Sequence, residues 1–298
     1  MRVRTAKFKN LLRNGFFWCV FLSLISTSGI SQSKKCFLSL LDTTTSAPNS
    51  IAKISAIAKI NGIEIAASKH LWRKDFTKSN PVIVFSNAFL RKSSESKIPE
   101  IKRVLKFLKD SFSTTIDVVF TGHLYRHNKH FSETATKGMR HQEDLKNQYL
   151  EAVRQLGIDP QFFRIRLWQE DVLISEYLKK IEGLEKIYEA HNGFKVRIDK
   201  MVEKIITLKG RNPSKAKYQL AAKGFLMEEL VSLLNGFPFP DNSAHGLIFH
   251  PVAKDRASNE LHDLVDWIMG SDSEAIDLRK VFDAENMQLR PSFLDLLL

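Results

Sequence analysis

The stretch that decides the fold is Pro81-Val-Ile-Val-Phe-Ser86-Asn87, a short apolar and β-branched run that stops at a serine. A run of this length, bounded by turn-forming residues, predicts a buried strand of a parallel sheet. In an open parallel sheet, ligands bind beyond the carboxyl ends of the strands, where the loops converge with free backbone donors. Ser86 therefore has the position of a nucleophile, although a serine that closes a strand is also an ordinary turn residue.

Further strands and amphipathic helices follow this strand. Residues 99–112 and 137–156 have helical spacing of apolar residues, whereas residues 115–121 and 162–168 are apolar runs typical of strands. A strand–helix–strand–helix–strand order predicts a parallel sheet with right-handed crossovers. We therefore expect an α/β fold, a Rossmann-like parallel sheet with helices on both faces.

The remainder of the chain is predicted to be mainly helical. Short strands are expected on either side of Asn61-Gly62 within residues 51–67, and another strand at residues 245–250. The expected helices are residues 172–190, 195–208, 213–234 and 258–269. The third of these helices is expected to stop at Asn235-Gly236. The tail to Leu298 alternates acidic and apolar residues without a clear period.

The positive charge of the chain is concentrated at its N-terminus. The formal net charge is +12, and seven basic residues precede the first acidic residue, Asp42, which leaves +5 for the remainder. An apolar run of about ten residues, 16–25, is too short to span a bilayer, which takes about twenty. A basic start, a short apolar run and small residues are typical of a secretory signal, and an Arg-rich, acid-free start also fits a transit peptide. We expect residues 1–42 to be a targeting or membrane-associating leader, with membrane association through residues 1–31, and residues 43–298 to be a single α/β domain.

Composition excludes several classes of site. The two cysteines, Cys19 and Cys36, lie in the leader, so the body has no cysteine-based metal site and no disulfide framework. The chain has no P-loop and no G-x-G-x-x-G motif, so neither ATP hydrolysis nor a dinucleotide cofactor is indicated. No cofactor is expected.

The long helix at 213–234 carries an informative acidic residue. Ala222, Leu226, Glu229, Leu230 and Leu233 share one face, which puts Glu229 within an apolar stripe and Glu228 about 100° away. A carboxylate on a buried face is costly unless it is paired or has a raised pKa, and a raised pKa suits a general acid or base. The alternative is a helix that is apolar over most of its circumference, with Glu229 at the edge and bonded to a lysine.

Histidines and basic residues indicate two further possibilities. His123, His127 and His130 have a spacing that metal sites can use, but the stretch is basic and has no H-E-x-x-H, so a solvated loop that faces phosphate is favoured. Basic residues also recur on two predicted crossover helices, where they form either solvated faces or one phosphate-binding surface. These are Lys102, Arg103, Lys106 and Lys109 on the first helix, and Arg140, Lys146 and Arg154 on the second.

Four segments together resemble the tRNA-dependent cyclodipeptide synthases, enzymes similar in architecture to the catalytic domain of class I tyrosyl- and tryptophanyl-tRNA synthetases. The resemblance spans about residues 81–268. The segments are Val84-Phe-Ser-Asn-Ala-Phe89, the basic helix from Met139 to Gly157 with the strand that ends at Trp168, Phe225-Leu-Met-Glu-Glu229-Leu, and Ile248-Phe-His-Pro251.

Three positions depart from the family pattern. Val84 replaces the glycine that precedes the family's serine, and Phe225 replaces a tyrosine whose hydroxyl holds the substrate amine. At the last strand, either Phe249 or His250 takes the place of a second tyrosine, and the alignment on His250 keeps a polar group in the site.

The resemblance implies an aminoacyltransferase that makes cyclic dipeptides, or diketopiperazines, from two aminoacyl-tRNAs per product, through a seryl aminoacyl-enzyme and without ATP. Ser86 would be the nucleophile, and Glu229 would hold the substrate ammonium group and take its proton. The expected catalytic residues are Ser86, Phe225, Glu229, Phe249 and His250; the expected substrate-binding residues are Asn87, Phe89 and Gly122; and the expected tRNA-binding residues are Lys102, Lys106, Lys109, Arg140, Lys146 and Arg154. A monomer in the cytosol or an organelle is expected.

Two other functions compete with catalysis. The lost glycine and tyrosine favour a non-catalytic RNA-binding relative, in which Ser86→Ala changes nothing. The basic leader favours a membrane-associated or exported protein, for which deletion of residues 1–42 abolishes function. Charged tRNA is absent outside cells, so an exported chain would not be a synthase.

Overall fold

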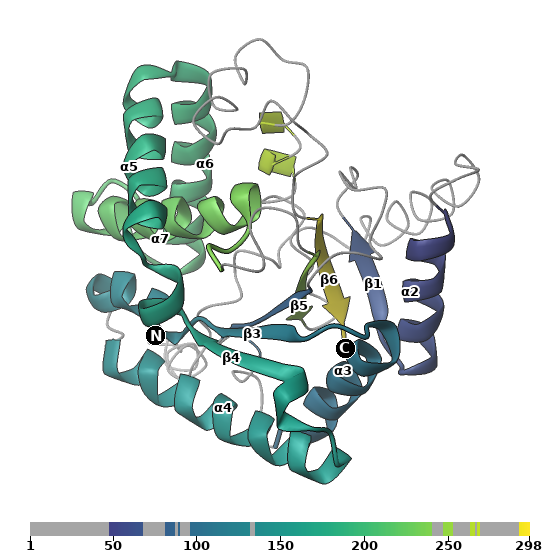
Figure 1. Cartoon of the computed structure of the whole chain (residues 1–298). Helices are drawn as coiled ribbons and strands as arrows, with labels where there is room; N and C mark the ends of the chain where they lie inside the picture. Colours follow the sequence, from purple (N-terminus) through teal and green to yellow (C-terminus); the bar gives the residue numbers. More distant parts are fainter. Residues whose placement is uncertain are drawn as a thin grey trace, which may run out of the picture.

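The computed structural model describes residues 48–67, 81–86, 89, 96–131, 135–239, 247–252, 263–265, 267–268 and 292–298. Its centre is a six-stranded sheet of order β1-β6-β5-β2-β3-β4 (Figure 1). All neighbouring strands are parallel except β1, which pairs antiparallel with β6 at one edge. The strands are β1 (Glu64–Ala67), β2 (Val82–Phe85), β3 (Ile116–Phe120), β4 (Phe163–Leu167), β5 (Leu247–Val252) and β6 (Ser292–Leu297).

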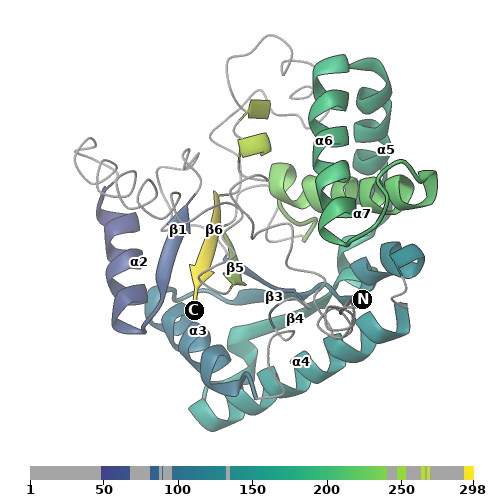
Figure 2. The same cartoon turned by 180° about the vertical axis from the view of Figure 1, so that it is seen from behind.

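Helices cover both faces of this sheet, as the two opposite views show (Figures 1 and 2). One face packs against α2 (Pro48–Ile60), α3 (Ile98–Ser111) and α4 (Ala135–Leu156), and the other against α5 (Ser175–Ala190), α6 (Asn192–Leu208) and α7 (Ala216–Asn235). Shorter turns complete the described part: the 3-10 helices η3 (Gly122–Phe131) and η4 (Pro160–Phe162), and the π turn η5 (Trp168–Val172). The predicted Rossmann-like α/β fold is confirmed.

Alternation along the strands separates two cores. In β2, Val82 belongs to the core under α5–α7, whereas Ile83 and Phe85 belong to the core under α3 and α4. In β5, Ile248 belongs to the core under α5–α7 and Phe249 to the core under α3 and α4. Because side chains alternate between faces with a period of two, Ser86 and His250 project toward the α5–α7 face.

Strand order reverses between β2 and β5. From β2 the chain proceeds outward through β3 to β4, and it then returns to the other side of β2 with β5. The crevice beyond the carboxyl ends of two such strands is where open α/β sheets bind ligands. Ser86 follows β2 directly and therefore lies at this point.

Three expectations were wrong. Residues 48–60 are a helix rather than a linker and a strand, because Ile54, Ile57 and Ala58 bury one helical face. The Asn61-Gly62 turn exists, with Gly62 at a φ of 70°, but it joins α2 to β1. The tail contains strand β6, and the basic stretch after β3 forms η3.

Other boundaries agree with expectation. Gly157 and Gly236 end α4 and α7 with φ values of 61° and 73°, in the region that favours glycine. Residues 263–265 and 267–268 are helical, as predicted for part of 258–269. Within the described part, none of the helices is both long and apolar enough to cross a membrane. The predicted leader, residues 1–42, lies outside the described residues.

Candidate active site

Three neighbouring parallel strands bring a serine, a histidine and an aspartate together. Nε2 of His250, on β5, lies 3.4 Å from Oγ of Ser86, and Nδ1 of His250 lies 3.3 Å from Oδ1 of Asp295 on β6. His250 and Asp295 are direct neighbours in the β5–β6 register. Both side chains are buried, at 8% and 1% exposure. The contact between Ser86 and His250 thus bridges the two strands that flank the switch point.

The structure distinguishes the two alignments of the last strand. Phe249 points to the opposite face, where its ring contacts Phe107 at 5.6 Å and Phe112 at 5.7 Å between centroids. Of the two candidates, His250 is therefore the one that faces Ser86. Phe249 is part of the core that packs on α3.

Glu229 is near the same histidine and has an unusual protonation equilibrium. The pKa of Glu229 is raised to about 7, mainly by burial; proximity to His250 lowers this pKa, and the carboxylates of Glu228 and Asp295 raise it. Its Oε2 is inaccessible to solvent and accepts no hydrogen bond within the described part of the chain. The lysine partner of the alternative interpretation is likewise not found among the described residues.

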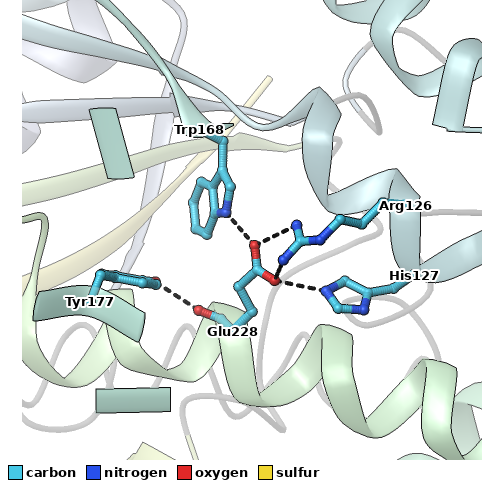
Figure 3. Close-up of polar contacts among 5 residues, drawn as sticks. All are labelled: Arg126, His127, Trp168, Tyr177 and Glu228. Atoms are coloured by element: carbon cyan, nitrogen blue, oxygen red, sulfur yellow. Dashed lines mark hydrogen bonds and ion pairs between the residues drawn. The ribbon is translucent and has the colours of Figure 1, made fainter. Parts of the chain in front are cut away.

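Glu228, the preceding residue, lies in a cluster of partners (Figure 3). Arg126 donates to both carboxylate oxygens of Glu228, His127 Nε2 lies 2.7 Å from Oε2, and Trp168 Nε1 donates to Oε1 over 2.5 Å. Tyr177 donates to the backbone carbonyl of Glu228 over 2.7 Å. Burial alone would raise the pKa of Glu228, but the hydrogen bonds from His127 and Arg126 hold it below its ordinary value.

This cluster shows how far the buried surface of the long helix extends. Glu228, about 100° from Glu229 around the helix, is only 1% exposed, so the buried surface of the helix extends beyond the predicted stripe. The helix is buried over most of its circumference from Phe225 onward. Glu229 lies on the helix face that was predicted to be buried. Glu228 on the neighbouring face is buried as well, because η3 and η5 supply hydrogen-bond partners for its carboxylate and α5 supplies one for its backbone carbonyl.

The remaining substrate-binding candidates have structural contacts. Phe89 packs its ring edge-to-face on Phe85 at 5.6 Å, on the face away from Ser86. Gly122 is buried against α4 and its N–H donates to Gln142 over 2.8 Å; a Cβ there would lie 2.5 Å from Cβ of Gln142. Its lack of a side chain therefore lets η3 approach α4. Asn87 lies outside the described residues.

Phe225 lies one turn before Glu229 on α7. Its ring is buried and lies 6.5 Å from that of His127, nearly perpendicular to it. A phenylalanine at this position supplies apolar surface and no hydroxyl. The charged groups that influence Glu229 are His250 on β5, Glu228 on α7 and Asp295 on β6.

The histidine stretch is not a solvated loop. His127 packs against α7, where a Cβ on Gly224 would come within 2.9 Å of Nδ1 of His127. Burial and the charge of Arg126 lower the pKa of His123. Across the described ranges, no group of three potential ligands is arranged to hold a metal ion. The side chain of His130 is outside the described set.

The basic crossover helices lie side by side on the face opposite α7. The backbone N–H of Lys97 donates to Gln148 Oε1 over 2.7 Å, and Lys102 Nζ donates to Gln155 Oε1 over 3.3 Å. These contacts show that α3 runs parallel to the second half of α4. Because crossover helices run antiparallel to the strands, the N-terminus of α4 lies at the carboxyl edge of the sheet. Arg140 is near that edge, and Arg154 lies about 20 Å further along the helix axis.

These basic residues also differ in their pairing. Arg154 binds Glu151 through two hydrogen bonds of 2.8 and 2.6 Å, and Lys146 forms an ion pair with Glu143 at 3.7 Å. Lys106, Lys109 and Arg140 are exposed and make no hydrogen bond or ion pair within the described part. Arg140 thus combines exposure with proximity to the edge that carries Ser86.

Sequence reasoning missed two groups of residues. Asp295 was missed because the tail gave no strand period, although a single aspartate within Phe293-Leu-Asp-Leu-Leu is the signal of a buried, paired carboxylate. Asp117 in β3 has the same pattern, and Arg164 and Arg166 bind it at 2.8 and 2.9 Å. Arg126 and Trp168, which bind Glu228, gave no separate signal.

Solved structures of other proteins share the fold of this chain, although sequence comparisons find no relative. No protein-family model matches the chain, and no curated protein matches it by sequence. Among solved structures, a cyclo(L-leucyl-L-phenylalanyl) synthase has a TM-score of 0.53 at 13% identity over 78% of this chain and 97% of its own. A cyclodipeptide synthase from Staphylococcus haemolyticus gives 0.53 at 12% identity, over 79% of this chain and 99% of its own.

A third structure connects the fold with tRNA synthetases. The Mycobacterium tuberculosis protein, whose structure relates cyclodipeptide synthetases to type I tRNA synthetases, gives a TM-score of 0.51 at 11% identity, over 80% of this chain and 94% of its own. At such identities the likeness concerns architecture alone. The chain has the fold of the cyclodipeptide synthases.

Proposed function

We propose that the protein is a cyclodipeptide synthase that uses two aminoacyl-tRNAs through an aminoacyl ester on Ser86, without ATP. The observation that carries the proposal is the position of Ser86. It follows β2 at the strand-order reversal, its hydroxyl contacts His250, and the same histidine influences Glu229. The shared fold with cyclodipeptide synthases supports the substrate class.

The first half of the reaction is an acyl transfer. Ser86 Oγ attacks the carbonyl carbon of the aminoacyl ester, the ester bond to the tRNA ribose breaks, and the ribose oxygen leaves with a proton. No external energy source is needed, because the ester of a charged tRNA is already activated. The product of this half-reaction is an aminoacyl ester on Ser86.

The second half requires a base for an amine. The ammonium group of the aminoacyl ester on Ser86 must lose a proton before its nitrogen can attack the ester carbon of a second aminoacyl-tRNA. Glu229, with a pKa of about 7, is partly ionised near neutrality and takes that proton. The attack leaves a dipeptidyl ester on Ser86, and the ribose oxygen of the second tRNA leaves with a proton. The dipeptidyl ester then closes through its free amine, which releases the cyclic dipeptide and restores the Ser86 hydroxyl. Phe225 offers an apolar wall in place of a hydroxyl that would hold the amine.

Binding of tRNA is assigned to the basic surface of α3 and α4, through phosphates and without sequence recognition. Arg140 is expected to contribute most, because it is exposed and close to the carboxyl edge. Replacing Arg140 with glutamate should raise the KM for charged tRNA more than the same change at Arg154, which is paired with Glu151. Equal effects would argue against this orientation of the tRNA.

The test of the function is expression of the protein in bacteria and mass spectrometry of the culture medium. Wild type should release a cyclic dipeptide that is absent with Ser86→Ala. A chain without residues 1–42 should keep this activity. If wild type releases none while the purified protein still binds tRNA, the non-catalytic RNA-binding alternative is the correct one.

A further inference from the structure

We infer that Ser86, His250 and Asp295 form a Ser–His–Asp relay, in which His250 accepts the proton of Ser86 and Asp295 holds the imidazole in position. For the synthase reaction this inference rests on the proposed function. The relay also gives Ser86 a reactivity of its own, toward small activated acyl and phosphonyl compounds that are not attached to tRNA.

The direction of the hydrogen bonds follows from the groups involved. An ionised carboxylate can only accept, so the Nδ1 of His250 that lies 3.3 Å from Asp295 carries the hydrogen. In the neutral ring the other nitrogen then has a free lone pair, and Nε2 lies 3.4 Å from Ser86 Oγ. The hydroxyl of Ser86 therefore donates to a nitrogen that is free to take its proton. This is the order of contacts that activates a serine on several unrelated folds.

The sheet fixes the three groups with respect to one another. His250 and Asp295 are register partners on two parallel strands, and β2 continues the sheet on the other side of β5. Asp295 is fully buried, and the ring of Phe293 lies 5.9 Å from that of His250. A site built on strands is held more firmly than one built on loops, so little reorganisation is needed before Ser86 attacks.

Each proton in the relay has a defined path. As Ser86 Oγ forms a bond to the acyl carbon, its proton passes to Nε2 of His250, and Asp295 stabilises the resulting imidazolium. When the bond to the ribose oxygen breaks, Nε2 returns the proton to that oxygen. His250 serves the serine and Glu229 serves the amine, so each of the two proton transfers has its own base.

The experiment measures the reactivity of Ser86 without tRNA. The purified full-length protein is incubated with an alkyl phosphonofluoridate, whose phosphorus takes the serine oxygen and releases fluoride, and the adduct is located by peptide mass spectrometry. Wild type should be labelled at Ser86, and Ser86→Ala should show no adduct there. His250→Gln should react about 10²- to 10⁴-fold more slowly, the usual size of a general-base contribution.

Two further variants separate chemistry from folding. Added imidazole should restore part of the labelling in His250→Ala, which a structural defect would not permit. Asp295→Asn, which keeps the shape of the side chain, should label more slowly than wild type, because the imidazolium of His250 loses the neighbouring negative charge that stabilises it. Besides Asp295, the acidic group near His250 in the described part is Glu229 on α7.

The matched control is His127→Gln. His127 also contacts a buried carboxylate, Glu228, but it belongs to the cluster on η3. Labelling of Ser86 in this variant should stay close to the wild-type rate. The relay is overturned if His250→Gln reacts as fast as wild type, or if His127→Gln slows labelling as much as His250→Gln does.

The same samples distinguish the relay from the synthase function. Labelled Ser86 without any cyclic dipeptide in the culture medium would support the relay and refute the proposed function. A cyclic dipeptide from a wild-type protein whose Ser86 stays unlabelled would refute the relay and leave the function standing. With neither signal, both proposals fall.

Discussion

Glu228 and Glu229 are consecutive residues on α7, yet they lie in opposite kinds of environment. Glu228 receives hydrogen bonds from Arg126 and Trp168 and contacts His127, and its pKa is held down (Figure 3). Glu229 has a buried oxygen without a partner in the described part, and its pKa is raised to about 7. A fully paired buried carboxylate joins structural elements, whereas an unpaired one is available to exchange protons. The comparison therefore indicates a structural role for Glu228 and supports the proposed role of Glu229 as a base.

The sharpest test of this division is Glu229→Gln. Loss of the base should lower cyclic dipeptide formation by about 10²- to 10⁴-fold. Unfolding in urea at pH 8 should show equal or greater stability than wild type, because the folded state disfavours the charge that glutamine removes. A large loss of stability would mean that Glu229, like Glu228, is structural.

Glu228→Ala should have the opposite effect. Removal of the carboxylate leaves Arg126, His127 and Trp168 without their common acceptor, and breaking a buried ion pair in this way costs about 3–5 kcal/mol. Urea denaturation followed by tryptophan fluorescence measures this change. A cost below that of an ordinary surface substitution would show that the cluster does not hold η3 and η5 on α7.

The two residues should also differ in how stability depends on pH. The lowered pKa of Glu228 contributes stability that is present above the ordinary pKa of glutamate and lost as the pH falls through the folded-state pKa. The raised pKa of Glu229 costs stability as the pH rises from its ordinary value to about 7, and that cost is complete above 7.

Consequently, the stability difference between wild type and Glu228→Gln should shrink on acidification below about pH 4.5, the ordinary value for a glutamate. The difference between wild type and Glu229→Gln should have the other sign and grow between about pH 5 and 7. Urea titrations over this range measure both. Parallel curves for the two variants would remove the distinction between them.

The smallest expected effect is that of Gly224→Ala, one turn before Glu228. The new Cβ would lie 2.9 Å from Nδ1 of His127, so the imidazole that contacts Glu228 must shift. Replacing glycine with alanine within a helix ordinarily stabilises a protein by about 1 kcal/mol. The disturbed contact between His127 and Glu228 should offset this gain, so the variant should be no more stable than wild type. A gain of the full propensity value in urea denaturation would show that His127 moves without cost.

Much of the fold was accessible from the sequence because its signals are local. The strand at residues 81–86, the helix–strand alternation through Trp168 and the glycines that end α4 and α7 all follow from periodicity and turn chemistry. Residues 51–60 were misjudged because isoleucine and alanine suit both a strand and a helix, and only packing on the sheet decides. Strand β6 was missed because it is completed by pairing with β5 and β1, which lie far away in the sequence.

The candidate site was accessible only in part. Ser86, Glu229 and His250 were predicted as site residues, and the structure brings Ser86 and His250 into contact; their catalytic roles stay predictions. Asp295 depends on strand register, and the partners of Glu228 depend on which face of α7 meets η3. Neither property can be read from the spacing of residues along one element, because each arises from contacts between elements about 50 to 100 residues apart.

The proposed mechanism requires that Ser86 carries an aminoacyl group during turnover. Intact-protein mass spectrometry after rapid mixing with charged tRNA measures this directly, and the Glu229→Gln variant should accumulate the ester because its second step is slow. We predict a mass increase equal to one aminoacyl group, located on the peptide that contains Ser86 and absent from Ser86→Ala. Cyclic dipeptide formation with an unmodified Ser86, or an equal mass increase in Ser86→Ala, would contradict the account.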